Sequence, residues 1–138
     1  MRSLKILGVV SALVVLAPQL AVADDVHGTD KMICASVEAT VCSLDGCESG
    51  TPWLWDIPQF VEVDLKAKRL STTVASGENR ATPIKSLERK DGLIFIQGVE
   101  NGRAFSFVIT ESTGVLSAAV AREEITVSVF GACTPLSR

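Results

Sequence analysis

The chain has 138 residues, with 13 Lys and Arg, 16 Asp and Glu, one histidine and no tyrosine, and a formal net charge of −3. Removing Arg2 and Lys5, which belong to the N-terminal segment discussed next, leaves 11 basic against 16 acidic residues, so the remaining chain carries a net charge of about −5. An acidic domain without a basic stripe argues against nucleic acid as a partner, because phosphate binding depends on clustered Lys and Arg.

Residues 1–23 have the pattern of a secretory signal peptide. Two basic residues precede an apolar run of about 12 residues, and the small-residue pattern "AVA" at 21–23 suits cleavage before Asp24. The run is too short for a permanent membrane helix. We therefore expect a periplasmic or secreted protein with no membrane span after cleavage. A loose polar tail at 24–31 and a single β domain at 32–138 would follow.

From residue 32 onward the sequence predicts strands, and no segment shows sustained helical periodicity. A first strand is expected near 32–38, and later turn signals recur about every 8–12 residues between β-branched runs. This spacing predicts an antiparallel all-β meander of about eight strands, as an up-and-down barrel closed by a disulfide. A two-sheet β-sandwich is the alternative. The register of 81–90 stays open, because Ile84 and Leu87 fall on opposite faces unless a bulge intervenes.

The strongest local signal is the segment 93–110, "LIFIQGVENGRAFSFVIT". Asn101-Gly102 is a preferred pair for a two-residue type I′ hairpin turn, because both positions need positive φ. That turn places Gly98 opposite Phe105 on one apolar face, where the glycine leaves room for a ring. The same turn pairs Ile96 with Phe107. Four-residue loops at 111–114 and 121–124 continue the same face with these pairs: Ile109 and Leu116, Phe107 and Ala118, Val120 and Ile125, Ala118 and Val127.

Four cysteines, Cys34, Cys42, Cys47 and Cys133, allow three pairings in an exported chain. Cys42 and Cys47 enclose "SLDG", a turn across which a local bridge is easy. That leaves Cys34 for Cys133, which the alternation from Val129 directs inward. This disulfide would join the first strand to the last, at the seam of a sheet that curls round to meet itself. Four residues between the close pair disfavour redox exchange, and a single close pair disfavours a zinc site.

Few side chains are suited to catalysis or metal binding. His27 lies in the polar tail and is expected to be solvated rather than a metal ligand. Nucleophilic catalysis would lack a base within the fold. Glu62 and Asp64 alternate with core residues and are expected on the solvated side, as are the basic residues of the 66–69 turn. We therefore expect no enzyme, no catalytic residue, no metal site and no cofactor.

The stretch "TPWLWDIPQF" at 51–60 interrupts the strand pattern and holds both tryptophans between two prolines. If it is extended, Trp53 and Trp55 project to one side. Indole rings serve well at a ligand mouth or as hot spots for a protein partner, so Trp53, Trp55 and the adjacent Asp56 are the candidate binding residues. The structural alternative is a plug over one end of the barrel.

Several of these segments together resemble a family of small, uncharacterised exported proteins of Gram-negative bacteria. The segments are "CSLDGC", "IPQFVEVDL", "LIFIQGVENGRAFSFVI", "STGVLSAAV" and "VFGACTP". They consist of turns, core positions and cysteines. The resemblance implies a periplasmic β protein and transfers no catalytic residue.

Two function classes remain from the sequence. The first is a binding module that holds a small apolar or amphipathic ligand inside the barrel or at its tryptophan mouth. The second is a protein that binds another envelope protein, such as an inhibitor of an envelope hydrolase, or a purely structural envelope protein. The oligomeric state is left open.

Overall fold

The computed structural model describes residues 24–76 and 80–136, so the signal peptide predicted at 1–23 lies outside the described residues. The described part is all-β, as predicted, with two short 3₁₀ helices, and none of its helices is long and apolar enough to cross a membrane. The elements in chain order are β1 (Lys31–Ser43), β2 (Gly46–Gly50), η1 (Pro52–Trp55), β3 (Phe60–Asp64), β4 (Arg69–Thr72), η2 (Val74–Ser76), β5 (Ala81–Pro83), β6 (Ser86–Lys90), β7 (Leu93–Glu100), β8 (Arg103–Thr110), β9 (Val115–Arg122) and β10 (Ile125–Pro135).

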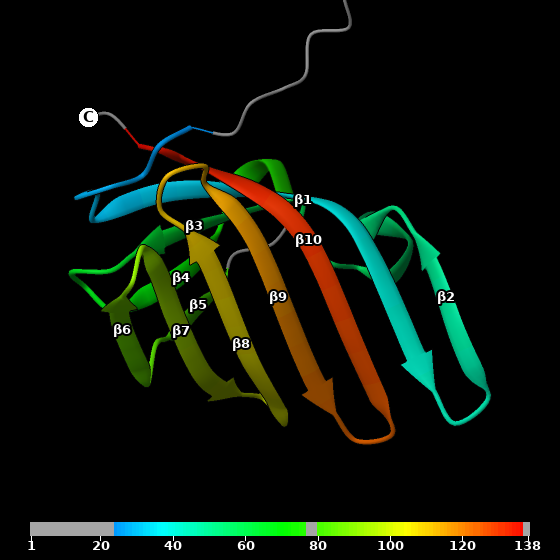
Figure 1. Cartoon of the computed structure of the whole chain (residues 1–138). Helices are drawn as coiled ribbons and strands as arrows, with labels where there is room; N and C mark the ends of the chain where they lie inside the picture. The colour runs from blue at the N-terminus through cyan, green and yellow to red at the C-terminus, as the bar shows by residue number, and fades with distance from the viewer. Residues whose placement is uncertain (1–23, 77–79, 137–138) are drawn as a thin grey trace, which may run out of the picture.

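The described strands form one curled antiparallel sheet in the order β5-β4-β3-β1-β10-β9-β8-β7-β6, with β2 paired to β1 off this path. Apart from the excursion of β2, the order is that of an up-and-down meander whose first and last strands pair. Figure 1 shows the curl, which brings the strip β3–β5 behind the front strands β7–β10. The sheet is therefore a half-barrel.

The predicted seam is confirmed. Cys34 lies opposite Cys133 in the ladder between β1 and β10, and the two are joined by a disulfide with both side chains only 1% exposed. The local disulfide between Cys42 and Cys47 is confirmed as well. It crosses the β1–β2 hairpin, whose pairing extends β1 past its expected end. β1 thus pairs with β10 along its length, and with β3 and then β2 on its other side.

The sheet opens on the side away from the seam. Within the described residues no ladder joins β5 to β6, which are the two ends of the strand order. The connecting residues tie the edges instead: Ile84 N–H donates to the Lys68 carbonyl at 2.8 Å, and Lys85 N–H to the Gln97 carbonyl at 2.9 Å. The single strand expected at 81–90 is therefore two strands. The break lets both Ile84 and Leu87 pack on the core, which one regular strand would prevent.

The register of the central hairpin is confirmed pair by pair around the Asn101-Gly102 turn, where φ is 47° and 72°. The pairing of β8 with β9 is also as predicted. The pairing of β9 with β10 differs by two residues: Val120 lies opposite Val127, and Ala118 opposite Val129. The cause is a two-residue turn at Glu123-Glu124 in place of the expected four-residue loop. A shift of two keeps every side chain on its predicted face.

The prediction of a loose tail at 24–31 is wrong. Val26 is fully buried, and its N–H donates to the Glu111 carbonyl at 2.8 Å. Asp30 accepts a backbone hydrogen bond from Leu65, and Lys31 already belongs to β1. One apolar residue in a polar stretch anchors the segment, because its burial is favourable and its backbone finds partners in the sheet.

Asp64 at the end of β3 yields a testable pH dependence. Its carboxylate accepts a hydrogen bond from Ala67 N–H at 2.7 Å and lies 3.3 Å from Lys31 Nζ. These contacts, the backbone hydrogen bond first, lower its pKa below the ordinary 3.8. A lowered pKa stabilises the fold above the ordinary value, and this stabilisation is lost as pH falls through the folded-state pKa. Asp64→Asn should therefore be less stable than the parent at pH 7, with a difference that shrinks toward zero by about pH 2.

The measurement is urea unfolding of parent and variant across that pH range. Glu62→Gln is the matched control, because Glu62 lies two residues away on the same strand and is exposed. The control should show no such pH-dependent difference. If the difference in stability between Asp64→Asn and the parent stays constant down to about pH 2, the lowered pKa of Asp64 is not its cause.

Candidate functional site

The inside of the curled sheet holds a groove of about 510 Å³. Its floor is the inward face of β8, β9 and β10, and the opposite side is formed by β3, β4, β5 and the segment after η1. The floor is apolar, with these side chains lining it: Phe105, Phe107, Leu116, Ala118, Val127 and Val129. A volume of this size lies within the range of small-molecule sites in proteins.

Two phenylalanines on β8 shape the floor. The rings of Phe105 and Phe107 lie 5.7 Å apart, centre to centre, with their planes at 59°. Gly98 on β7 admits the first ring, because a Cβ there would lie 2.4 Å from Phe105 Cζ. Alternation along the strand directs both rings inward, as the sequence predicted.

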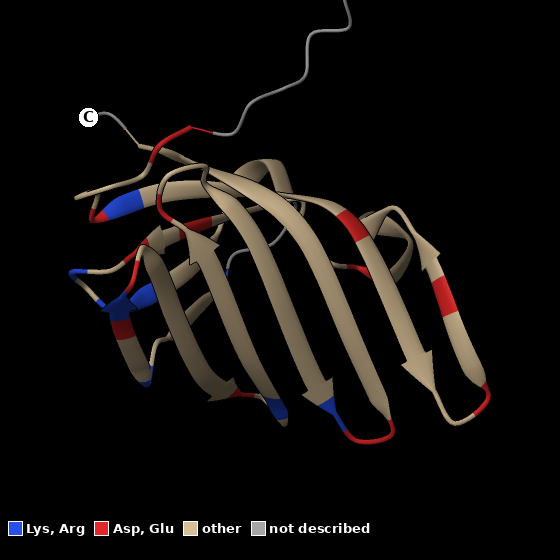
Figure 2. Ribbon diagram, viewed as in Figure 1, with Lys and Arg blue, Asp and Glu red and all other residues tan. Residues whose placement is uncertain are grey.

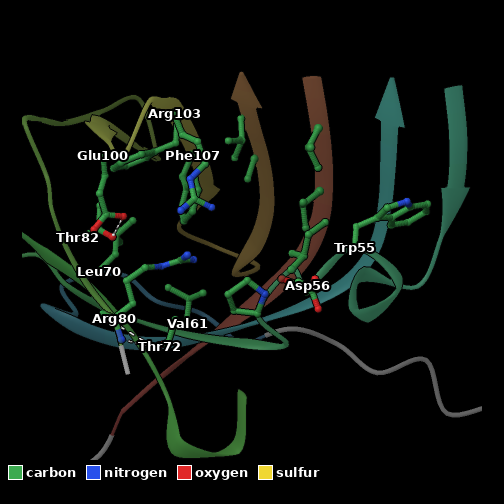
Figure 3. A pocket seen from close by; sticks show the side chains of 18 of the residues that line it. Trp55, Asp56, Val61, Leu70, Thr72, Arg80, Thr82, Glu100, Arg103 and Phe107 are labelled. Atoms are coloured by element: carbon green, nitrogen blue, oxygen red, sulfur yellow. Dashed lines mark hydrogen bonds between the residues drawn. The ribbon is translucent and has the colours of Figure 1, made fainter. Parts of the chain in front are cut away.

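The predicted tryptophan segment contributes one ring to the groove. Pro52–Trp55 is a 3₁₀ helix rather than an extended segment, so the two rings do not project to one side. Trp55 is half-buried, packs on the core and lines the groove together with Asp56 (Figure 3). Trp53 is 64% exposed and does not line the groove. A proline at the start and Asp56 with a left-handed φ of 54° at the end define the helical turn.

The other end of the groove is polar. Arg80, Thr82, Glu100 and Arg103 line it, and Figure 3 shows both arginine side chains reaching into the cavity. Thr82 Oγ1 donates a hydrogen bond to Glu100 Oε2 at 2.5 Å, which links β5 to β7 across the opening of the sheet. Figure 2 shows that the charged residues of β7–β10 gather at the strand ends, and Glu100 is the last residue of β7 and Arg103 the first of β8. The groove is therefore amphipathic.

Sequence reasoning did not single out this polar end. Its signal was nevertheless present, because Glu100 and Arg103 face each other across the hairpin turn and share the face of Phe105 and Phe107. When the apolar face of a sheet is concave, a charged pair at the end of that face lies at the opening of the resulting cavity. Arg80 and Thr82 carried no comparable signal, since they reach the groove only through the curl of the sheet.

The remaining charged candidates lie outside the groove. His27 is half-exposed and pairs with Asp25 at 2.7 Å, and its backbone N–H and ring lower the pKa of that carboxyl. Its Nε2 lies 4.0 Å from Glu111. No group of three or more possible metal-binding side chains occurs in the part of the chain that the structure describes. Glu62 is exposed, and Asp64 is occupied by Ala67 and Lys31.

The arrangement can hold a small molecule. An apolar floor excludes water from a ligand, and a few polar groups at one end fix its orientation. Comparison with known proteins identified no matching family model, no matching curated protein and no matching solved structure.

Proposed function

We propose that the protein is an exported binding module that holds a small apolar or amphipathic ligand in the groove of its half-barrel. The observation that carries the proposal is the 510 Å³ groove with its floor of inward-facing phenylalanine and aliphatic side chains. Two disulfides support export, because such bonds persist in oxidising compartments. Burial of an alkyl chain on this floor would supply about 0.8 kcal/mol per methylene.

The test uses the two tryptophans as matched reporters. In Trp53→Phe the remaining indole is Trp55, which lines the groove, and in Trp55→Phe it is the exposed Trp53. The probe is 10-bromo-1-decanol, a neutral alcohol whose bromine quenches indole fluorescence only on contact. We expect saturable quenching of most of the emission in Trp53→Phe, and only weak, linear collisional quenching in Trp55→Phe.

A complementary readout is calorimetric titration of the parent with the same alcohol, which should give one site per chain. If the calorimetric titration detects no binding and both single-tryptophan proteins show only linear quenching, the groove does not hold apolar ligands and the proposal fails.

The exposed part of η1 favours a second candidate function. Trp53 and Leu54 are each 64% exposed and adjacent, and an exposed indole is a frequent hot spot of protein interfaces. This surface would bind a partner protein independently of the groove. Native mass spectrometry of protein purified from its own compartment separates the two functions. A retained mass of a few hundred daltons supports ligand binding, whereas a stoichiometric protein partner and no small molecule would favour the second function.

A further inference from the structure

We infer that the ligand is a single-chain amphiphile with a compact anionic head, such as a carboxylate, which the arginine end of the groove binds. The inference rests on the proposed function, and it adds the chemical class of the ligand and its orientation. The head would lie among Arg80, Arg103 and Arg122, and the tail would run along the floor toward Trp55.

The first step is the placement of the three arginines. Arg103 begins β8, Arg122 ends β9, and they lie one position beyond the paired residues Ala104 and Ala121. They are therefore neighbours across two adjacent strands. Alternation places Arg103 on the face of Phe105 and Arg122 on the face of Val120, so both belong to the inward side and both line the groove.

The second step is the charge balance. Among the described residues no carboxylate lies within ion-pair distance of Arg103 or Arg122. Glu100, the nearest acidic residue along the hairpin, accepts its hydrogen bond from Thr82 instead. Arg80 enters from the opposite side, and Figure 3 shows its side chain and that of Arg103 directed toward the same space. Arg103 and Arg122 are neighbouring like charges that repel one another, and an anion between them would turn this repulsion into attraction.

The third step is the geometry of recognition. A guanidinium group presents a planar fork of N–H donors that matches the two oxygens of a carboxylate or phosphate. Arg103 is half-buried at the edge of an apolar floor, where such a hydrogen bond is less screened than at an open surface. At this end of the groove Arg103 and Arg122 outnumber the one carboxylate of Glu100, and Asp56 lies at the far, Trp55 end (Figure 3).

The experiment compares three chain-matched competitors: decanoate, decanol and decyltrimethylammonium. Each displaces 10-bromo-1-decanol from the Trp53→Phe protein, and the recovery of Trp55 emission gives its affinity. We expect decanoate to bind about tenfold more tightly than decanol, and the cation to bind more weakly than both. Raising the ionic strength should weaken decanoate binding and leave decanol binding unchanged.

Arg103→Gln should lose the preference for decanoate by about tenfold and keep its affinity for decanol. Arg122→Gln serves as a second variant with the same expectation. Lys66→Gln is the matched control, because it removes one positive charge at an exposed turn outside the groove. The control should keep the full preference.

Equal affinities of the parent for decanoate, decanol and the cation would overturn the assignment of an anionic head and leave the proposed function intact. If Lys66→Gln loses the preference for decanoate over decanol as fully as Arg103→Gln does, the assignment is also overturned, because the preference would then depend on net charge alone. A protein that binds none of the three, nor the bromoalcohol, would contradict the proposed function itself.

Discussion

Replacing Cys34 and Cys133 with alanine should lower the free energy of unfolding by about 4–5 kcal/mol. The disulfide closes a loop with a sequence separation of 99, so its removal restores a large conformational freedom to the unfolded chain. Small domains have only about 5–15 kcal/mol of stability in total. The double variant should therefore be marginally folded, although the backbone ladder between β1 and β10 remains available to it.

The measurement is urea unfolding at neutral pH, and the control is Cys42→Ala with Cys47→Ala. That disulfide spans a sequence separation of only 5 at an exposed hairpin, and the same chain-entropy relation gives a loss of about 2 kcal/mol. Equal losses in the two double variants would show that loop length does not govern the effect. If the Cys34→Ala, Cys133→Ala protein is as stable as the parent, the disulfide at the seam does not stabilise the fold.

The second large effect is expected at Gly114, in the turn between β8 and β9. Its φ is +66°, and a Cβ there would lie 2.2 Å from the Cys133 carbonyl oxygen and 2.6 Å from that of Asp24. Gly114→Ala therefore combines an unfavourable backbone conformation with a clash against two backbone segments that hydrogen bonds hold in place. We expect a loss of about 3–5 kcal/mol in the free energy of unfolding.

Gly92→Ala separates the two causes. Gly92 has a similar φ of +75°, but a Cβ there would meet nothing within 4 Å. This control should lose only about 1–2 kcal/mol, the cost of the left-handed conformation. Urea unfolding of both variants gives the comparison. If Gly114→Ala loses no more free energy of unfolding than Gly92→Ala, the added methyl group does not clash with Cys133 and Asp24, and the expected cost of close packing is wrong.

Much of the fold was predictable from the sequence because its signals act over short distances. The Asn101-Gly102 turn determines the register of β7 and β8 locally, and alternation then assigns each side chain to a face. The turn between β9 and β10 shows the limit. Without a glycine or asparagine in "REE", the sequence does not indicate that two residues suffice, so the register was wrong by two while the faces were right.

The N-terminal segment and η1 show where local signals mislead. Asp24–Asp30 is polar by composition, and only the tertiary structure reveals that Val26 fills a buried position. The sequence predicts equivalent roles for Trp53 and Trp55, because an extended chain would place them on one side. In the structure Trp55 packs on the core, and its ring lies so near Gly50 that a Cβ on that glycine would be 3.3 Å from Trp55 Cη2. The helical turn of η1 separates this ring from that of Trp53.

The sequence alone determined the strand class, the apolar face and both disulfide pairings, because these depend on alternation, turn chemistry and the number of cysteines. Only the tertiary structure decided that the sheet stays open between β5 and β6 and that its concave side ends in a cluster of arginines. The physical reason is that Arg103 and Arg122 are neighbours through the pairing of β8 with β9, whereas Arg80 precedes β5 and lies on the opposite side of the groove. Arg80 reaches the other two only after the sheet has curled, and no local pattern records how far a sheet will curl.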